Sequence, residues 1–88
     1  YSPGIPLRMN VVKPKKYEAY VLLNKRKNNH PNFFYLSKRS NLKEAAKNLY
    51  SSLRKIKNKG YKSIAVEKIL NIGIGQSIND RLKRASKF

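Results

Sequence analysis

Cysteine is absent from this sequence of 88 residues, and histidine occurs once. Without cysteine the chain can form neither a disulfide nor a thiolate metal site. The single histidine, His30, lies in the segment Asn-Asn-His-Pro-Asn, where we expect a solvated turn residue and not a metal ligand or a catalytic base. The sequence therefore predicts no metal site.

Long apolar runs are also absent. No run approaches the ~20 residues that a helix needs to cross a bilayer, and the N-terminus lacks the charged-then-apolar pattern of a signal peptide. We therefore expect no membrane partner and a soluble, cytoplasmic protein. Because the chain begins at Tyr1 and not at methionine, we also expect a segment of a longer protein, whose missing part holds the chemistry.

Acidic residues are scarce, with four against 21 lysines and arginines. The four carboxylates belong to Glu18, Glu44, Glu67 and Asp80, which fall on four separate predicted elements. General acid–base catalysis by paired carboxylates needs two of them at one place. The sequence therefore predicts no catalytic residue. A hydrophobic content of 40% suffices for one core but leaves no room for an enclosed active site.

The resulting net charge of +17 would attract any polyanion, and such binding would weaken with added salt. The basic residues are spread over predicted loops, helix flanks and the last helix. No basic–aromatic interleaving of the ribonucleoprotein-motif kind is present in the sequence. Two interpretations follow: the lysines are solvated faces, or they bind nucleic acid such as tRNA by non-specific electrostatics.

Residues 1–16 are predicted to form an extended lead-in, because four prolines and glycines interrupt the stretch. Residues 17–23 and 33–36 are the first two strand candidates, each with a continuous apolar run. The loop of residues 24–32 is too short for a helical crossover. These two strands are therefore expected to be antiparallel neighbours or not to be neighbours.

The clearest element is a helix that begins after Asn41, with Glu44 three residues later as in a capping box. Gly60 is a natural left-handed stop. Residues 63–67 are a third strand, so residues 33–67 form a βαβ unit with parallel strands. Apolar residues recur along one face of the helix at steps of three and four: Leu42, Ala45, Ala46, Leu49, Leu53 and Ile56.

A second helix is predicted to start near Gly75. Its apolar stripe consists of Ile74, Ile78, Leu82 and Ala85. Asp80 and Arg84 are spaced for a favourable i,i+4 ion pair; alternatively, Asp80 accepts backbone amides of the incoming loop. Gly73 and Gly75 lack the third glycine of a dinucleotide fingerprint and the Gly-Lys-Ser/Thr of a Walker loop. We interpret them as a tight strand-to-helix connection.

Several of these motifs together resemble a known family. They are Glu-Ala-Ala and Leu-Tyr within residues 44–50, Ile-Ala-Val at 64–66, Gly-Ile-Gly at 73–75 and Ile-Asn-Asp-Arg-Leu at 78–82. The chain resembles the C-terminal domain of the two-domain threonylcarbamoyl-AMP synthases over nearly its whole length. The most specific part is Gly-x-Gly followed by Ile-Asn-Asp-Arg-Leu, whose family positions correspond to Gly73, Gly75, Asn79, Asp80 and Arg81.

The resemblance implies an enzyme that converts L-threonine, bicarbonate and ATP into threonylcarbamoyl-AMP and pyrophosphate, for threonylcarbamoyladenosine in tRNA. It places ATP and magnesium in a YrdC-like catalytic domain of the same chain, and no cofactor in the present residues. It also implies that a linker, matched here by Ser2, Pro3, Gly4 and Arg8, acts as a lid at the catalytic cleft. Arg8 is the residue expected near a nucleotide phosphate, although Met9-Asn10-Val11-Val12 replaces the usual Arg-His-Tyr-Ala-Pro type of continuation.

The expected fold is a small Rossmann-like α/β module of two or three layers, with three to four strands, a βαβ unit and two main helices. Residues 1–16 are an interdomain linker or lead-in, and residues 17–88 an accessory domain. The first functional hypothesis is an accessory domain that docks on the catalytic domain and positions the linker lid without catalysis of its own. The alternative is a free-standing basic RNA-binding module. A third hypothesis, an independent enzyme, has no residue constellation to support it.

Overall fold

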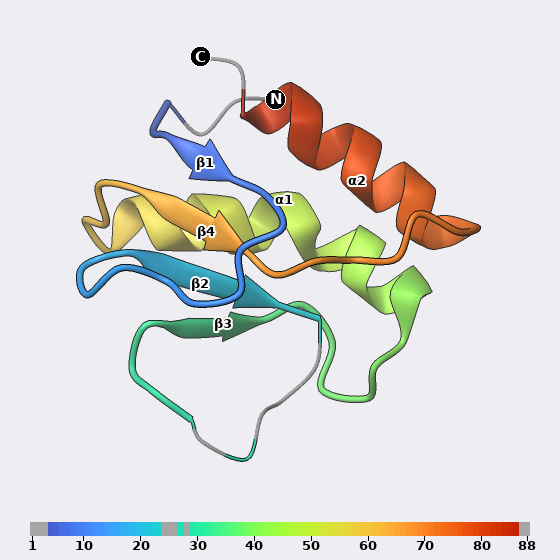
Figure 1. Ribbon diagram of the computed structural model, residues 1–88, viewed down its shortest axis with the longest axis horizontal. Helices are drawn as coiled ribbons and strands as arrows, with labels where there is room; N and C mark the ends of the chain where they lie inside the picture. The colour runs from blue at the N-terminus through green and yellow to red at the C-terminus, as the bar shows by residue number, and fades with distance from the viewer. Residues whose placement is uncertain (1–3, 24–26, 28, 87–88) are drawn as a thin grey trace.

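A computed structural model describes residues 4–23, 27 and 29–86 of the chain. Four parallel strands form one sheet in the order β1-β4-β2-β3, and two helices pack on it (Figure 1). The elements along the chain are β1 (Leu7–Arg8), β2 (Ala19–Leu22), β3 (Phe33–Tyr35), α1 (Leu42–Asn58), β4 (Ile64–Val66) and α2 (Ile74–Ala85). The predicted small α/β module with a βαβ unit and two main helices is confirmed.

The relation between β2 and β3 was predicted wrongly. The two strands are direct neighbours and run parallel, with Tyr20 opposite Phe33 and Leu22 opposite Tyr35. The prediction assumed that a parallel return needs a helix. However, a three-residue strand is only about 10 Å long, while the connecting residues 23–32 can reach about 33 Å when extended. Strands this short can therefore be joined in parallel by a loop alone.

The βαβ unit of β3, α1 and β4 is parallel, as predicted, but β2 lies between its two strands. The central strands β2 and β4 are buried along their whole length. This burial explains their continuous apolar sequences, since a strand covered on both faces has no solvent side for polar residues.

Helix α1 begins as predicted, with the Asn41 side chain accepting the backbone N–H of Glu44 at 3.1 Å. The reciprocal half of the capping box is replaced: the Asn41 N–H donates to Ser37 Oγ, and the Glu44 carboxylate binds Arg39 instead. Four residues of the predicted stripe, Ala45, Leu49, Leu53 and Ile56, are fully buried against the sheet. Gly60 has a φ of +90° and ends the helical segment as expected.

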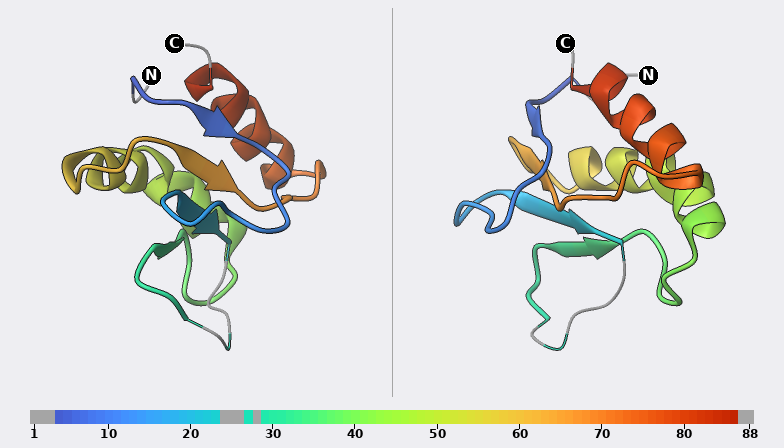
Figure 2. Two further views of the ribbon diagram at one scale, coloured as in Figure 1. Left: turned by 60° about the vertical axis from the view of Figure 1, so that its left-hand side comes forward. Right: turned by 45° about the vertical axis from the view of Figure 1, so that its right-hand side comes forward.

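The two faces of the sheet are covered differently, which makes the fold a two-layer module. Both helices lie on one face, and the other face carries no described helix (Figure 2). On the helix-free face Val11, Tyr20, Leu22 and Ala65 form a second, smaller core. Tyr20 fixes the covering segment, because its hydroxyl donates to the Val11 carbonyl at 2.6 Å. Neither described helix is long and apolar enough to span a bilayer.

Part of the predicted lead-in is hydrogen-bonded to the sheet of the domain. Leu7–Arg8 forms the edge strand β1 beside β4, and the Leu7 side chain is buried. Hydrogen bonds flank the strand: the Ile64 N–H donates to the Pro6 carbonyl at 2.8 Å, and the Val11 N–H donates to the Val66 carbonyl at 2.9 Å. Residues 7–11 are therefore held by backbone bonds to the sheet and are not a free tether.

Candidate functional site

Arg8, the residue predicted to approach a nucleotide phosphate, is engaged in a bidentate ion pair. Its Nε and Nη2 donate to the two carboxylate oxygens of Glu18 at 3.0 and 2.5 Å. The Glu18 side chain is only 2% exposed and also accepts the Lys15 N–H. The Arg8 hydrogen bonds, with a smaller contribution from Lys15, lower the pKa of the Glu18 carboxyl despite its burial. Arg8 thus joins β1 to the start of β2, and its nucleotide contact stays a prediction.

The other predicted linker residues are less informative. Ser2 and Pro3 lie outside the described residues. Gly4 has a φ of +76°, a backbone conformation that favours glycine. Strand β1 begins three residues after Gly4, at Leu7.

Gly73 and Gly75 form the connection into α2, and each glycine is needed for a different reason. Gly73 adopts a φ of +58°, with no neighbouring atom in the way of a side chain. A Cβ on Gly75, by contrast, would lie 2.1 Å from the carbonyl oxygen of Leu70. The Gly75 and Gln76 amides donate to the Ile72 and Gly73 carbonyls at 3.0 and 3.1 Å. These two amides are used within the corner itself, so the geometry is that of a tight connection.

Asn79, the next predicted motif residue, lies on α2 just after the connection formed by Gly73 and Gly75. It is 8% exposed, and its side-chain amide donates to the Ile69 carbonyl at 2.8 Å and to Asn71 Oδ1 at 3.4 Å. The residue therefore fastens α2 to the loop that leads into it. Arg81 is partly buried on the same helix.

Asp80 is exposed, and the ion pair predicted with Arg84 is wrong for this structure. Among the described residues, no ion pair and no side-chain hydrogen bond involves Asp80 or Arg84. The alternative prediction for Asp80 is wrong as well, because its carboxylate accepts no amide of the described part of the incoming loop. An exposed pair gains little Coulomb energy in water and restricts two side chains, so both groups remain solvated. The predicted stripe is also changed at its first residue, because Ile74 is 42% exposed while Gly75 is buried in its place.

The carboxyl end of the sheet carries exposed apolar side chains. We call Leu23, Leu42, Ile69, Leu70 and Ile72 the carboxyl-end apolar surface; together with Glu67 and Lys68 they line a depression of 660 Å³. Ile69 is the buried floor of this surface, and Leu23 and Leu42 are half-buried. Leu70 is 67% exposed and Ile72 is 72% exposed. In open α/β sheets the carboxyl ends of the strands are where ligands commonly bind. The sequence analysis did not predict this surface. The signal that could have indicated it is the stretch Ile-Leu-Asn-Ile-Gly-Ile at residues 69–74. It is rich in large apolar residues, but an asparagine and a glycine interrupt it, so it is not a typical core strand.

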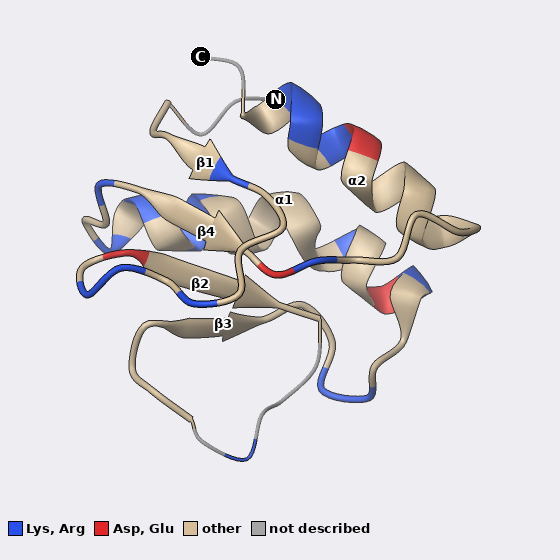
Figure 3. Cartoon of the chain, viewed as in Figure 1, with Lys and Arg blue, Asp and Glu red and all other residues tan. Residues whose placement is uncertain are grey.

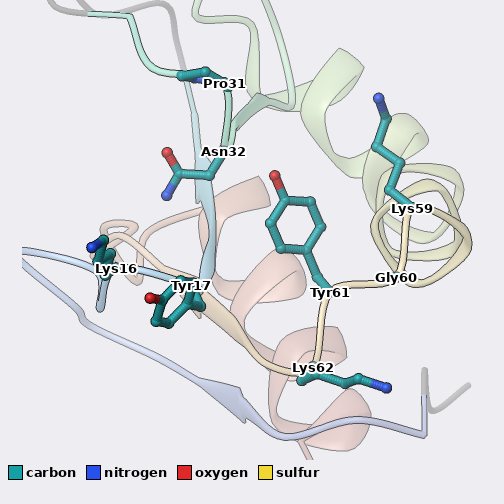
Figure 4. Close-up of a pocket in the computed structure, with 8 residues that line it drawn as sticks. All are labelled: Lys16, Tyr17, Pro31, Asn32, Lys59, Gly60, Tyr61 and Lys62. Atoms are coloured by element: carbon teal, nitrogen blue, oxygen red, sulfur yellow. The ribbon is translucent and has the colours of Figure 1, made fainter.

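The amino end of the sheet carries a depression of 490 Å³ with a different lining. The lysines that line it are Lys16, Lys59 and Lys62. The Tyr17 and Tyr61 rings come from the segments before β2 and β4 (Figure 4). Tyr17 is 79% exposed, with Lys16 Nζ 5.6 Å from its ring centre. Tyr61 is held by an edge-to-face contact with Phe34, with ring centres 5.6 Å apart. The sequence analysis did not predict this site, because its residues come from three separate segments.

The four acidic residues lie on four separate segments of the fold, as Figure 3 shows in red. Glu18 is bound to Arg8, Glu44 to Arg39 at 2.8 Å, and Glu67 accepts the Leu23 N–H at 2.7 Å. The Arg39 hydrogen bond is the main cause that lowers the pKa of the Glu44 carboxyl. In the described part of the chain, no three histidine or acidic side chains gather where they could hold a metal ion.

Comparison with known families adds one finding. A family model described as the threonylcarbamoyl-AMP synthase C-terminal domain matches residues 1–87. No curated protein and no solved structure matches the chain. The matched residues include every strand and helix of the fold, the connection formed by Gly73 and Gly75, and Asn79.

Proposed function

The chain belongs to the family of threonylcarbamoyl-AMP synthase C-terminal domains, and from this we propose that it is the accessory domain of such a synthase. In this proposal the domain docks on the catalytic domain of the same chain and positions the linker between the two, and it performs no chemistry itself. ATP, L-threonine, bicarbonate and magnesium bind to the catalytic domain. The product, threonylcarbamoyl-AMP, then serves the modification of tRNA.

The observation that carries the proposal is the anchoring of the lead-in on the domain. Strand β1 is paired with β4, Leu7 is buried, and Arg8 is locked to the buried carboxylate of Glu18. A linker that leaves from a fixed edge strand explores less space than a free one, so its effective concentration near a neighbouring site is higher. This is the mechanical property that a linker lid requires.

The carboxyl-end apolar surface is the proposed contact with the catalytic domain. Large apolar side chains at 67% and 72% exposure, beside a depression of 660 Å³, favour burial against a second surface. The family assignment supplies the occupant, since a C-terminal domain of a synthase is joined to the domain that carries the chemistry. Contacts between domains of one chain commonly bury a surface of this mixed kind.

The experiment uses the complete synthase with the double substitution Leu70→Asp and Ile72→Asp. Charges in a buried contact should favour the undocked state by about tenfold or more, so protease cleavage within the linker accelerates and pyrophosphate release slows. Ser51→Asp with Asn58→Asp is the matched control, because it adds the same charge at two exposed positions of α1 that lie outside both the linker and the surface. Equal cleavage and turnover in the double variant and the control would refute the proposed docking surface.

A further inference from the structure

The charged residues of the fold are distributed so that one belt of surface is purely cationic. Three adjoining depressions, of 380, 290 and 490 Å³, run from the helix-free face of the sheet to its amino end. All charged residues that line them are lysines, and none is acidic. We call this surface the lysine–aromatic belt; its lysines are Lys13, Lys15, Lys16, Lys27, Lys59 and Lys62.

The three depressions form a continuous path because neighbouring ones share walls. The first and second share Lys13, His30 and Phe33. The second and third share Lys16 and Asn32. The nearest carboxylate, Glu18, is 2% exposed and bound to Arg8, so it offers the belt little negative charge.

Aromatic rings lie along the same path and are held in place by one another. The His30 and Phe33 ring centres are 4.9 Å apart, and those of Tyr20 and Phe33 are 5.5 Å apart, both edge to face. Farther along, Tyr17 is largely exposed and Tyr61 is braced by Phe34. His30 is exposed like Tyr17, and Phe33 and Tyr61 remain partly exposed.

We propose that the lysine–aromatic belt binds a single-stranded nucleic acid, with lysines at the phosphates and with Tyr17, His30, Phe33 and Tyr61 as platforms for bases. Proteins that bind single strands combine a cationic groove with rings on which bases stack, since every base has a π-face. The carboxylates of an acidic peptide would bind the lysines but would leave the row of rings without a matching partner, whereas a single strand offers a base at each step. This proposal does not depend on the docking of the catalytic domain, which uses the opposite end of the sheet.

The ring contribution is tested in the full protein with an RNA and a DNA oligonucleotide of about ten nucleotides each. Tyr17→Leu should weaken binding of the single strand about tenfold, whereas Tyr17→Phe, which keeps the ring, should bind like the wild type. Heparin, a polyanion without bases, should bind both variants equally. Loss of affinity for heparin in parallel with the oligonucleotide would overturn the stacking role, as would equal binding by the Leu and Phe variants.

The lysine contribution is tested by the salt dependence of the same binding. For single strands the slope of log K against log salt is about −0.7 per neutralised phosphate. Lys16→Gln with Lys62→Gln should therefore reduce the slope by about 1.4. Lys43→Gln with Lys47→Gln removes the same charge from exposed positions on α1 outside the belt and should leave the slope nearly unchanged.

Three results would overturn the belt as the binding site. One is an equal change of slope in the belt and α1 double variants, which indicates attraction by net charge alone. Another is duplex binding as tight as single-strand binding. The third is loss of binding in the Leu70→Asp, Ile72→Asp variant, which would place the nucleic acid on the carboxyl-end apolar surface or on the docked assembly. RNA binding tighter than DNA binding identifies RNA as the ligand, and the reverse identifies DNA.

Discussion

The two ends of the parallel sheet are built on different principles. At the carboxyl end, backbone atoms approach one another closely: Gly75 lies against the Leu70 carbonyl, and Asn79 binds the Ile69 carbonyl. Apolar side chains surround this corner. At the amino end, the turns before β2 and β4 present the exposed side chains of Lys16, Tyr17 and Lys62 and the partly exposed ring of Tyr61.

This difference implies that the two ends respond differently to substitution. A corner closed by direct contact between backbone groups accepts one residue type at a given position, because nothing can yield without moving the main chain. A cationic surface depends on the sum of its charges and accepts lysine or arginine at many positions. Changes at the carboxyl end should therefore reduce stability, while changes at the amino end should alter binding and hardly affect stability.

Gly75→Ala should have the largest effect. Its Cβ would lie 2.1 Å from the Leu70 oxygen, so the start of α2 must shift, and we expect a loss of about 3 kcal/mol in the free energy of unfolding. Urea unfolding measures it. Gly60→Ala is the control: its φ is +90° but no atom lies within 4 Å of the new Cβ, so only backbone strain of about 1 kcal/mol is expected. Equal losses in the two variants would contradict the close contact.

Asn79→Ala should come next, with a loss of about 2 kcal/mol, because the buried Ile69 carbonyl is left without its side-chain donor. Asp80→Ala, one residue further along α2, removes an exposed carboxylate and should change the unfolding free energy by less than about 0.5 kcal/mol. The pair tests which half of the Asn-Asp motif stabilises the fold. A larger effect at Asp80 than at Asn79 would reverse the assignment.

Glu18→Gln tests the ion pair that holds β1. The Arg8 hydrogen bonds lower the pKa of Glu18 from its ordinary 4.5, so the carboxylate adds stability above pH 4.5 and this contribution disappears as the pH falls through the lowered value. At pH 7 the variant should lose about 1.5 kcal/mol. Its deficit against the wild type should shrink as the pH drops below 4.5, as measured by unfolding at several pH values. A deficit that is constant with pH would exclude the charge as its cause.

Local elements were predictable from the sequence because local rules determine them. Asn41 caps α1 through its own side chain, the apolar stripe of α1 has the helical period, and Gly60 supplies the left-handed turn. The start of α2 follows from the same kind of signal. The role of Gly75 was recognised only as that of a turn, because the carbonyl it contacts is five residues earlier in a loop whose course the sequence does not specify.

Features that depend on distant segments were not predictable. The parallel pairing of β2 with β3 follows from the shortness of both strands, which the apolar runs overestimate. The lysine–aromatic belt has no interleaved motif in the sequence, because Tyr17, Phe33 and Tyr61 are far apart in the chain and reach one side of the fold only when β2, β3 and β4 align their amino ends. The exposure of Ile74 likewise results from the corner, since Gly75 occupies the buried position.

The smallest effect on stability is expected at the amino end. Lys59→Gln with Lys62→Gln removes two exposed like charges from one rim of a protein of net charge +17, and relief of repulsion should raise the unfolding free energy by less than about 0.5 kcal/mol at low salt. The gain should vanish at about 0.5 M salt, where the Debye length falls to a few ångströms. Thermal unfolding of wild type and variant at both salt concentrations measures this. A loss of stability that persists in salt would mean that these lysines pack on the core, and that the amino end is constrained by contact as the carboxyl end is.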